Sequence, residues 1–427
     1  MVLRIQNLMF SFVVNPPSRK DYESAKSLVS NPNPAEAKYL EEEFSALVGP
    51  GFSTAFASAR MGFYSILKWK GVKEGDEVIV TGFTCSVMVN AILRAGAKPI
   101  FADIEIETLG TSPQSVEDAI SARTRVVVAQ HSFGFPCDIE KIRDLCEARG
   151  IFLVEDCALT LGSRVGKQRV GNFGSAALYS TDHTKPLNFG IGGFVFTRDF
   201  ELYTYLQKAA GTADSLSFDK QKSIYNQGLV ESRLISKGRL AELVWRNRLV
   251  LRLQKYLRLE SPFFDGDYSA SASESPYPYP APIPSFVAAI GRAQLAKVEQ
   301  IRLGRLNSLE VLLSCLEHLD LLKGPGPDPR TLLRQDFLPN RLVFLHPAGQ
   351  KVREALRKII VPEETWFLSN IVATSEPAGS YGYREGSCPN AEATFSTIVN
   401  IPIPSDVASA RTLCRKISQL IEVARIH

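Results

Sequence analysis

Residues 125–158 have the sequence RVVVAQHSFGFPCDIEKIRDLCEARGIFLVEDCA, and this stretch decides the fold. Its two ends, Arg125–His131 and Ile151–Glu155, are mainly apolar runs typical of strands buried on both faces. Between them, Asp138 can cap a helix whose apolar residues recur at helical spacing, and Gly150 can end it. A strand, a helix and a second strand in this order predict two parallel strands joined by a crossover helix.

The same alternation continues on both sides of this unit. Further runs rich in Val, Ile and Phe predict strands at Glu77–Val80, Pro99–Asp103, Ala176–Ser180 and Gly193–Thr197. Strands that alternate with helices indicate an α/β fold, with a mostly parallel sheet and helices on both of its faces. In such sheets ligands bind at the carboxyl ends of the strands.

The whole chain divides into an N-terminal segment, the domain with the alternating pattern, an insertion and a smaller C-terminal α/β domain. In the insertion, Lys237–Arg258 has the pattern of a basic amphipathic helix, and a Ser- and Pro-rich linker follows it. Such a helix either packs against the protein with a solvated basic face or contacts an anionic membrane surface, and both interpretations stay open. The predicted bounds of the segments are 1–40, 41–201, 202–284 and 285–427.

The C-terminal domain has clear helical and strand patterns of its own. The sequence predicts a helix over Val287–Leu322, a strand at Arg341–Leu345 and a final helix over Val407–Ile426. These elements can form a second, smaller core, and a chain of 427 residues is long enough for two packed domains.

Composition and charge exclude several classes of protein. With 45% hydrophobic and 22% charged residues, the chain has the composition of a soluble protein. A net charge of +4 is small for this length and does not indicate a nucleic-acid partner. No run approaches the roughly 20 apolar residues of a membrane helix. The seven cysteines are scattered without a CxxC pair, which indicates reduced thiols in a cytoplasmic protein rather than disulfides or a metal site.

Three short segments carry residues suited to chemistry. Asp156 ends a predicted strand, Ser180 ends another, and Lys185 lies between that second strand end and a Gly-Ile-Gly-Gly turn. Earlier in the chain, Ser58-Ala59-Arg60 opens a helix whose free N–H groups suit a phosphate. Each segment alone also fits an ordinary structural role, as a helix cap or a solvated lysine. Their combination is the more informative observation.

Together the segments match the requirements of pyridoxal 5′-phosphate. This cofactor needs a lysine amine that can form a Schiff base, and a carboxylate that keeps its pyridine nitrogen protonated. Its phosphate needs hydroxyl and backbone N–H donors. Lys185, Asp156 and the donors at Ser58-Ala59-Arg60 and Ser180 are residues of these types. Burial of Lys185 would lower its pKa and make the amine nucleophilic.

Taken in order, the motifs of the chain resemble those of the DegT/DnrJ/EryC1/StrS family of sugar aminotransferases. That family has the aspartate-aminotransferase-like architecture known as fold type I. The likeness runs from about residue 41 to the C-terminus, with a gap across 202–284. The matching stretches are GDEVIV (75–80), NAILRAGAKPIFAD (90–103), HSFGFPCD (131–138), VEDCA (154–158), VGNFG (170–174), GIGG (190–193), FVAAIGRAQL (286–295) and CPNAE (388–392).

The resemblance implies a role for each candidate residue. Lys185 would be the Schiff-base lysine and the catalytic residue, Asp156 would pair with the pyridinium, and Ser180 would bind the phosphate. Ser58-Ala59-Arg60 would stand at the family's phosphate loop, with Arg60 in the place of a threonine. The other positions that it implies for cofactor binding are Ala158, Cys85 and His131.

The resemblance also implies a function. Family members are homodimers with the active site at the subunit interface, and they usually move an amino group from glutamate to a nucleotide-linked keto sugar. The chain departs from the family at Leu159, where a glutamine is common, at Cys85, where an aromatic residue often stacks on the ring, and at Pro280–Ile283, where an Asn-Tyr-Arg-Met motif is absent. These departures keep an alternative open, a diverged cofactor-binding protein with altered or no transaminase activity and a regulatory or scaffold role.

Overall fold

The computed structural model describes residues 10–424 except 12, 14, 263, 271–274, 362–365, 375 and most of 240–260. The predicted basic helix at Lys237–Arg258 therefore lies largely outside the described residues, and its membrane contact stays a prediction. Within the described part of the chain, no helix combines the length and apolarity needed to cross a bilayer.

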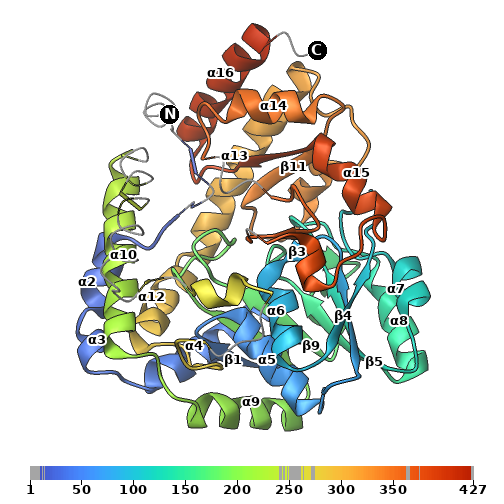
Figure 1. Ribbon diagram of the computed structural model, residues 1–427. Coiled ribbons are helices and arrows are strands. Elements are labelled where there is room, and N and C mark those ends of the chain that lie inside the picture. The colour runs from blue at the N-terminus through green and yellow to red at the C-terminus, as the bar shows by residue number, and fades with distance from the viewer. Residues whose placement is uncertain are drawn as a thin grey trace.

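A seven-stranded sheet with the strand order β1-β10-β9-β6-β5-β2-β4 lies at the centre of the protein (Figure 1). Strands β4, β2, β5, β6 and β9 are parallel, and β10 and β1 add antiparallel pairs at one edge. The predicted, mostly parallel sheet is confirmed, and β1 is the strand of this sheet that the sequence analysis missed. The strands are β1 Phe52–Phe56, β2 Glu77–Thr81, β4 Lys98–Ala102, β5 Thr124–Gln130, β6 Phe152–Asp156, β9 Ala176–Ser180 and β10 Gly193–Thr197.

Helices surround this sheet and build the C-terminal part of the molecule (Figure 1). The helices are α2 Arg19–Ala25, α3 Ser27–Ser30, α4 Ala35–Val48, α5 Ala59–Trp69, α6 Ser86–Arg94, α7 Pro113–Ala119, α8 Ile139–Arg149, α9 Phe200–Thr212, α10 Phe218–Ser236, α12 Ser285–Leu295, α13 Val298–His318, α14 Gly349–Leu356, α15 Pro389–Thr397 and α16 Val407–Ala424, with the 3₁₀ turns η1 Asp265–Tyr268, η2 Pro329–Arg334 and η4 Ala378–Tyr381.

The crossover helix α8 shows how the local sequence sets these elements. The Asp138 side chain accepts a hydrogen bond from the backbone N–H of Lys141, which caps the first turn. Gly150 ends the helix with a φ of 65°, a left-handed conformation that glycine adopts without steric cost. The helix face toward the sheet is apolar, and its residues Ile139, Ile142 and Cys146 are buried in one cluster with side chains of the strands. The N-cap residue, the apolar face and the C-terminal glycine of α8 all lie where the sequence predicts them.

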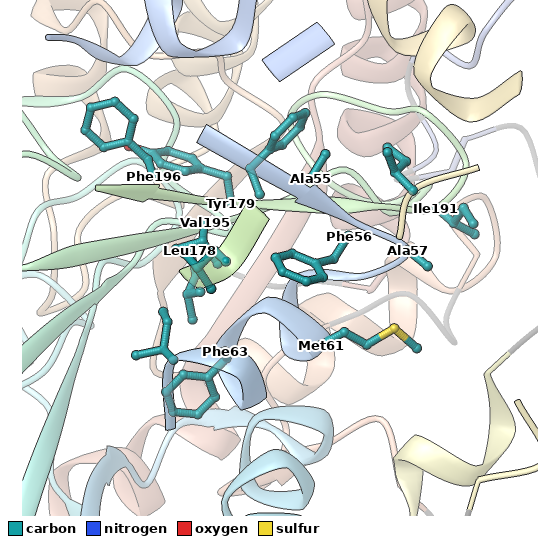
Figure 2. Close-up of a cluster of buried hydrophobic side chains, with 14 of the residues drawn as sticks. Ala55, Phe56, Ala57, Met61, Phe63, Leu178, Tyr179, Ile191, Val195 and Phe196 are labelled. Atoms are coloured by element: carbon teal, nitrogen blue, oxygen red, sulfur yellow. The ribbon is translucent and has the colours of Figure 1, made fainter. Parts of the chain in front are cut away.

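Helices α4 and α5 cover opposite faces of the antiparallel edge. On one face Phe44 of α4 stacks on Phe194 of β10, with ring centroids 3.9 Å apart. On the other face α5 approaches the sheet closely at Gly62, where a Cβ would come within 2.6 Å of Val195 Cγ2. Figure 2 shows Val195 on the side of the sheet that carries Met61 and the rest of α5. The alternating side chains of β10 thus join two layers of helices to one sheet.

The C-terminal part has a core of its own. Strand β11 (Arg341–Leu345) pairs antiparallel with β13 (Ile398–Pro402), and α13 packs against α16. The single helix predicted over Val287–Leu322 is two helices, because α12 packs with α4 in the core of the large sheet whereas α13 belongs to the C-terminal core. A short strand, β12 (Ile371–Val372), pairs with β3 (Thr84–Cys85) and connects this part to the large sheet's carboxyl edge.

We expect Phe44→Ala to lower the free energy of unfolding by about 3–5 kcal/mol, because it removes a fully buried ring and leaves a cavity against Phe194. Urea unfolding followed by circular dichroism measures the change. Phe200→Ala is the matched control, since that ring is 65% exposed, and its effect should stay below about 1 kcal/mol. Equal losses in the two variants would contradict this account of the core.

Candidate active site

A cavity of about 770 Å³, its open mouth included, lies at the carboxyl ends of β5, β6 and β9. The structure brings the predicted site residues together here, and Ser58 stands beside them as the cap residue of α5. Those that line the cavity are Ala59, Arg60, Cys85, His131, Asp156, Ala158, Ser180 and Lys185.

Asp156 is the last residue of β6 and is 7% exposed. Its Oδ1 accepts a hydrogen bond of 3.0 Å from the backbone N–H of Ala158, and its Oδ2 accepts none from the residues that the structure describes. Burial raises the pKa of the Asp156 carboxyl, and the Ala158 N–H and the charge of Lys185 offset this only in part. A protonated ring nitrogen placed at Oδ2 would supply the missing positive partner.

Lys185 lies in the loop between β9 and β10 and is 9% exposed. Burial lowers the pKa of its ammonium group, although Cys85, Asp182 and Asp156 act in the opposite direction. Its Nζ lies 4.2 Å from the centre of the Trp366 ring and forms no ion pair with the described residues. An amine held in this way is nucleophilic at a lower pH than an exposed lysine.

The start of α5 forms the other end of the cavity. A Cβ on Gly193 would come within 2.4 Å of the Ala59 nitrogen, so only glycine lets β10 and α5 approach this closely. The Ser58 hydroxyl is buried and has no hydrogen-bond partner among the described residues. The first N–H groups of a helix also lack intrahelical partners. These donors, with the positive end of the helix dipole, suit a phosphate.

Arg60 has a partner that the sequence analysis did not find. Its Nε donates to Asp267 Oδ2 over 2.5 Å, and Arg94 Nη2 lies 3.7 Å from Asp267 Oδ1. All three side chains are at least 90% buried. Arg60 Nη2 has no partner within the described part of the chain, so it remains able to donate to a phosphate oxygen. Asp267 comes from η1, in the segment for which the sequence predicts an irregular insertion.

His131 is held by the residue next to Asp156. The backbone N–H of Cys137 donates to His131 Nδ1 over 3.2 Å, so Nε2 carries the proton and donates to Glu155 Oε2 over 3.1 Å. His131, Glu155 and Cys157 place possible metal-ligand atoms within 4.8 Å of one another. The Glu155 carboxylate, however, already accepts a full set of hydrogen bonds. Its other donors are the backbone N–H groups of Gly171, Phe173 and Gly174.

Several lining residues come from positions without a sequence signal. Trp366 and Phe367 reach the cavity from the C-terminal part, and Tyr268 reaches it from η1. Asp182 also lines the cavity, and His183 together with Lys185 and Arg60 lowers the pKa of Asp182 to about 2, although burial acts to raise it. Two positions at which the chain departs from the family, Leu159 and Cys85, also line this cavity. No pattern of spacing marks these residues, because tertiary packing alone brings them here.

The donor set fits pyridoxal 5′-phosphate. Among the described residues, a carboxylate oxygen that accepts no hydrogen bond and a buried amine without an ion pair line one cavity at the edge of the sheet, and an unpartnered hydroxyl at the start of α5 adjoins it. Sheet and site together define the architecture of a fold-type-I enzyme.

The chain belongs to the DegT/DnrJ/EryC1/StrS aminotransferase family, whose model matches residues 27–242 and 272–417. This membership confirms the expected fold class and the expected cofactor, pyridoxal 5′-phosphate. The gap between the two matched ranges, 243–271, includes η1 and therefore Asp267 and Tyr268.

Individual relatives cover parts of the chain. It is 33% identical over 202 residues to the GDP-perosamine synthase of Vibrio cholerae, across 47% of this chain and 51% of that protein. It is 36% identical over 167 residues to the spore coat polysaccharide biosynthesis protein SpsC of Bacillus subtilis, across 39% and 43%. The chain thus spans about half the length of the curated relatives it matches. Among solved structures, Helicobacter pylori PseC, an aminotransferase involved in the biosynthesis of pseudoaminic acid, superposes with a TM-score of 0.69 at 16% identity over 96% of this chain and 98% of that one.

We expect Asp267→Asn to lower the free energy of unfolding of the cofactor-free protein by about 3–5 kcal/mol, because it leaves two buried arginines without their anion. Urea unfolding measures the loss, and millimolar inorganic phosphate should recover part of it by supplying an anion to Arg60. Glu117→Gln, which breaks the exposed pair with Arg149, is the control and should cost less than about 1 kcal/mol. A loss in Asp267→Asn no larger than in this control would show that the buried arginines do not need the carboxylate.

Proposed function

We propose that this chain is a pyridoxal-phosphate-dependent aminotransferase that moves an amino group from glutamate to a nucleotide-linked keto sugar, in cell-surface polysaccharide or amino-sugar biosynthesis. The observation that carries the proposal is that Lys185 and Asp156 line one cavity, where Lys185 Nζ forms no ion pair and Asp156 Oδ2 accepts no hydrogen bond within the described part of the chain. The family membership and the names of the relatives support the reaction type and the class of acceptor.

Different residues around the cavity would bind different parts of the cofactor. Asp156 would hold the proton of the ring nitrogen with its free Oδ2. Ser58, Ser180 and the N–H groups that begin α5 would hold the phosphate, with Arg60 Nη2 as a charged donor. Ala158, Cys85 and His131 would contact the ring. When bound, pyridoxal 5′-phosphate supplies a carbonyl carbon that takes up the amino group and a ring that accepts electrons.

Lys185 would carry the protons of the reaction. Its amine would hold the cofactor, and whenever it is not bound to the cofactor Nζ would be a base inside the cavity. Burial lowers the pKa of this group, so that it takes up and releases a proton closer to neutral pH than an exposed lysine does. Trp366, Phe367 and the apolar Leu159 exclude water around Nζ. A proton that Nζ takes from one carbon atom would therefore stay in the cavity, where Nζ could return it to a second carbon atom.

The proposal also includes a homodimer in the cytoplasm that acts on small molecules. The free thiols of all seven cysteines support a reducing compartment. Light scattering of the purified protein measures the oligomeric state, and a monomer at micromolar concentration would remove that part of the proposal.

We expect Lys185→Ala to abolish the yellow colour of the lysine-bound cofactor and to lower transamination by at least about 10²–10⁴-fold, because both the nucleophile and the base are lost. The absorbance spectrum and a glutamate-dependent assay measure the two effects. Lys167→Ala, at an exposed lysine, is the control and should match the unsubstituted protein. A colourless unsubstituted protein in added pyridoxal phosphate would refute the assignment.

The glutamate half-reaction separates the proposal from its alternative. A transaminase bleaches the lysine-bound colour when glutamate is added without acceptor, and 2-oxoglutarate restores it. A protein that keeps its colour in glutamate and in other amino acids is a cofactor binder with a different role, such as regulation.

The rate at which added pyridoxal phosphate binds Lys185 should rise with pH, because the neutral amine is the nucleophile. Burial lowers the pKa of Lys185, so the midpoint should lie below its usual value of 10.5. Of the charged groups that face Nζ, Asp182 and Asp156 raise this pKa and Arg341 lowers it. Asp182→Asn should therefore move the midpoint to lower pH, which stopped-flow absorbance measures. A shift to higher pH would contradict these assignments.

A further inference from the structure

The main chain on both sides of Lys185 is held by side chains from outside its own loop. The carbonyl oxygen of Thr184 accepts a hydrogen bond of 2.6 Å from Asn340 Nδ2, and the carbonyl oxygen of Pro186 accepts one of 2.7 Å from Arg305 Nη1. All of these residues are buried. The peptide groups that flank the proposed Schiff-base lysine are therefore bonded to two donors from distant parts of the chain.

Both donors come from the C-terminal part of the chain. Arg305 lies in α13, between Ile301, which packs against the core of the large sheet, and Leu309, which is buried in the C-terminal core. Asn340 comes directly before β11. Arg305 Nη1 also donates to the carbonyl oxygen of Pro339 over 3.0 Å. A single guanidinium nitrogen thus joins α13, the lysine loop and the segment that leads into β11.

The loop also has hydrogen bonds of its own, which act on the residues before Lys185. The backbone N–H of Lys185 donates to the Asp182 carbonyl oxygen over 2.9 Å, and Asn188 Nδ2 donates to the His183 carbonyl oxygen over 3.0 Å. These bonds fix the turn that leads to the lysine. The two outside donors fix the carbonyl groups on either side of it, and so set its position relative to the rest of the cavity.

A small displacement of Lys185 would be costly. Lys185 and Asp156 line the same cavity, and Lys185 Nζ lies 4.2 Å from the centre of the Trp366 ring. A displacement of about 1 Å in a reacting group can lower a rate roughly 10²-fold. The two flanking hydrogen bonds restrict such a movement, and the one from Arg305 is the stronger because its donor is charged.

We propose that Arg305 and Asn340 are positioning residues for Lys185, through which the C-terminal core sets the reactivity of its amine. The inference rests on the proposed function, because Lys185 is the residue that would bind the cofactor and move the protons. Neither Arg305 nor Asn340 is among the residues that line the cofactor cavity. Both therefore act through the main chain of Lys185 and not on the reacting atoms.

The first test follows the reaction of the holoenzyme with glutamate by stopped-flow absorbance. We expect Arg305→Met to lower the rate at saturating glutamate roughly 10–100-fold and to leave the half-saturating glutamate concentration within about twofold, because the base is displaced and the binding site is not. Asn340→Ala should lower the rate roughly 3–10-fold, as expected for a neutral hydrogen bond. Arg305→Lys, which keeps a charged donor, should recover part of the rate that Arg305→Met loses.

A matched control separates positioning from a general loss of stability. Leu309 is a fully buried residue of the same helix, one turn beyond Arg305, and it packs in the C-terminal core. Leu309→Ala should lower the free energy of unfolding but keep the rate with glutamate within about twofold of the unsubstituted protein, because the bonds to the lysine loop remain. An equal loss of rate in Leu309→Ala and Arg305→Met would overturn the inference.

The second test needs no cofactor. In the cofactor-free protein, trace acetylation with acetic anhydride at a series of pH values, followed by mass spectrometry of the Lys185 peptide, gives the midpoint at which this amine loses its proton. Burial lowers the pKa of Lys185, so release of the loop into water should move the midpoint toward the usual value of 10.5. Asn340→Ala changes no charge, so a shift in this variant reports position alone. The titratable and charged groups that face Nζ are kept in every variant: Cys85, Asp182, Asp156 and Arg341.

The two tests keep the two proposals apart. An unsubstituted protein that does not react with glutamate would remove the proposed function, while the acetylation midpoints would still report on the positioning of Lys185. Midpoints that stay unshifted in Arg305→Met and Asn340→Ala would overturn the inference, even if both variants react slowly with glutamate. If Arg305→Met does not fold, Asn340→Ala and Arg305→Lys decide the question with the same two measurements.

Discussion

Parallel pairing of β5, β6 and β9 is the constraint on which the site depends. In strands that are buried on both faces, polar side chains lie mainly at the strand ends. The register of the parallel strands places these ends next to one another. Gln130 pairs with Asp156, and Asp156 pairs with Leu178, two residues before Ser180. The residues that follow each strand therefore meet at one edge of the sheet. His131, Asp156 and Ser180 line one cavity for this reason, although long stretches of sequence separate them.

The C-terminal part of the chain forms the rest of the cavity wall at the edge of the sheet. The Trp366 ring contacts two cations, with Lys185 Nζ at 4.2 Å and the Arg341 guanidinium at 5.2 Å from its centre. Asn400 of β13 donates a hydrogen bond to the Trp366 carbonyl oxygen, and β12 pairs with β3 beside Cys85. The same contacts that join the two cores thus place a ring over the reactive amine. Separation of the cores would expose Lys185 to water and raise its pKa toward that of an ordinary lysine.

Features set by interactions between neighbouring residues could be predicted from the sequence, and features set by tertiary packing could not. The strands, the α8 caps and the residues at strand ends depend on local pattern, so β9 and β10 have the predicted bounds and the predicted site residues come together. Asp267 and Trp366 depend on packing between elements far apart in the chain, and nothing in their neighbouring residues marks them. The edge strand β1 was missed because Ser53 and Thr54 interrupt its apolar pattern, although both are buried by packing. The break between α12 and α13 is also a result of tertiary packing. The sequence pattern is helical throughout, but α12 packs into one hydrophobic core and α13 into the other.

The charge balance around Arg60 explains how the predicted insertion can contribute to the proposed phosphate site. Arg60 and Arg94 carry two positive charges, and Asp267 carries one negative charge, so the buried group has a net charge of +1. Without Asp267, two buried cations would repel each other at a high desolvation cost. With it, one positive charge remains beside the positive end of α5, which suits a phosphate without requiring a surplus of buried charge. Arg60 also lines an adjoining cavity, so its ion pair with Asp267 fixes a wall that the two cavities share. The insertion is therefore part of the wall that decides what can lie next to the cofactor.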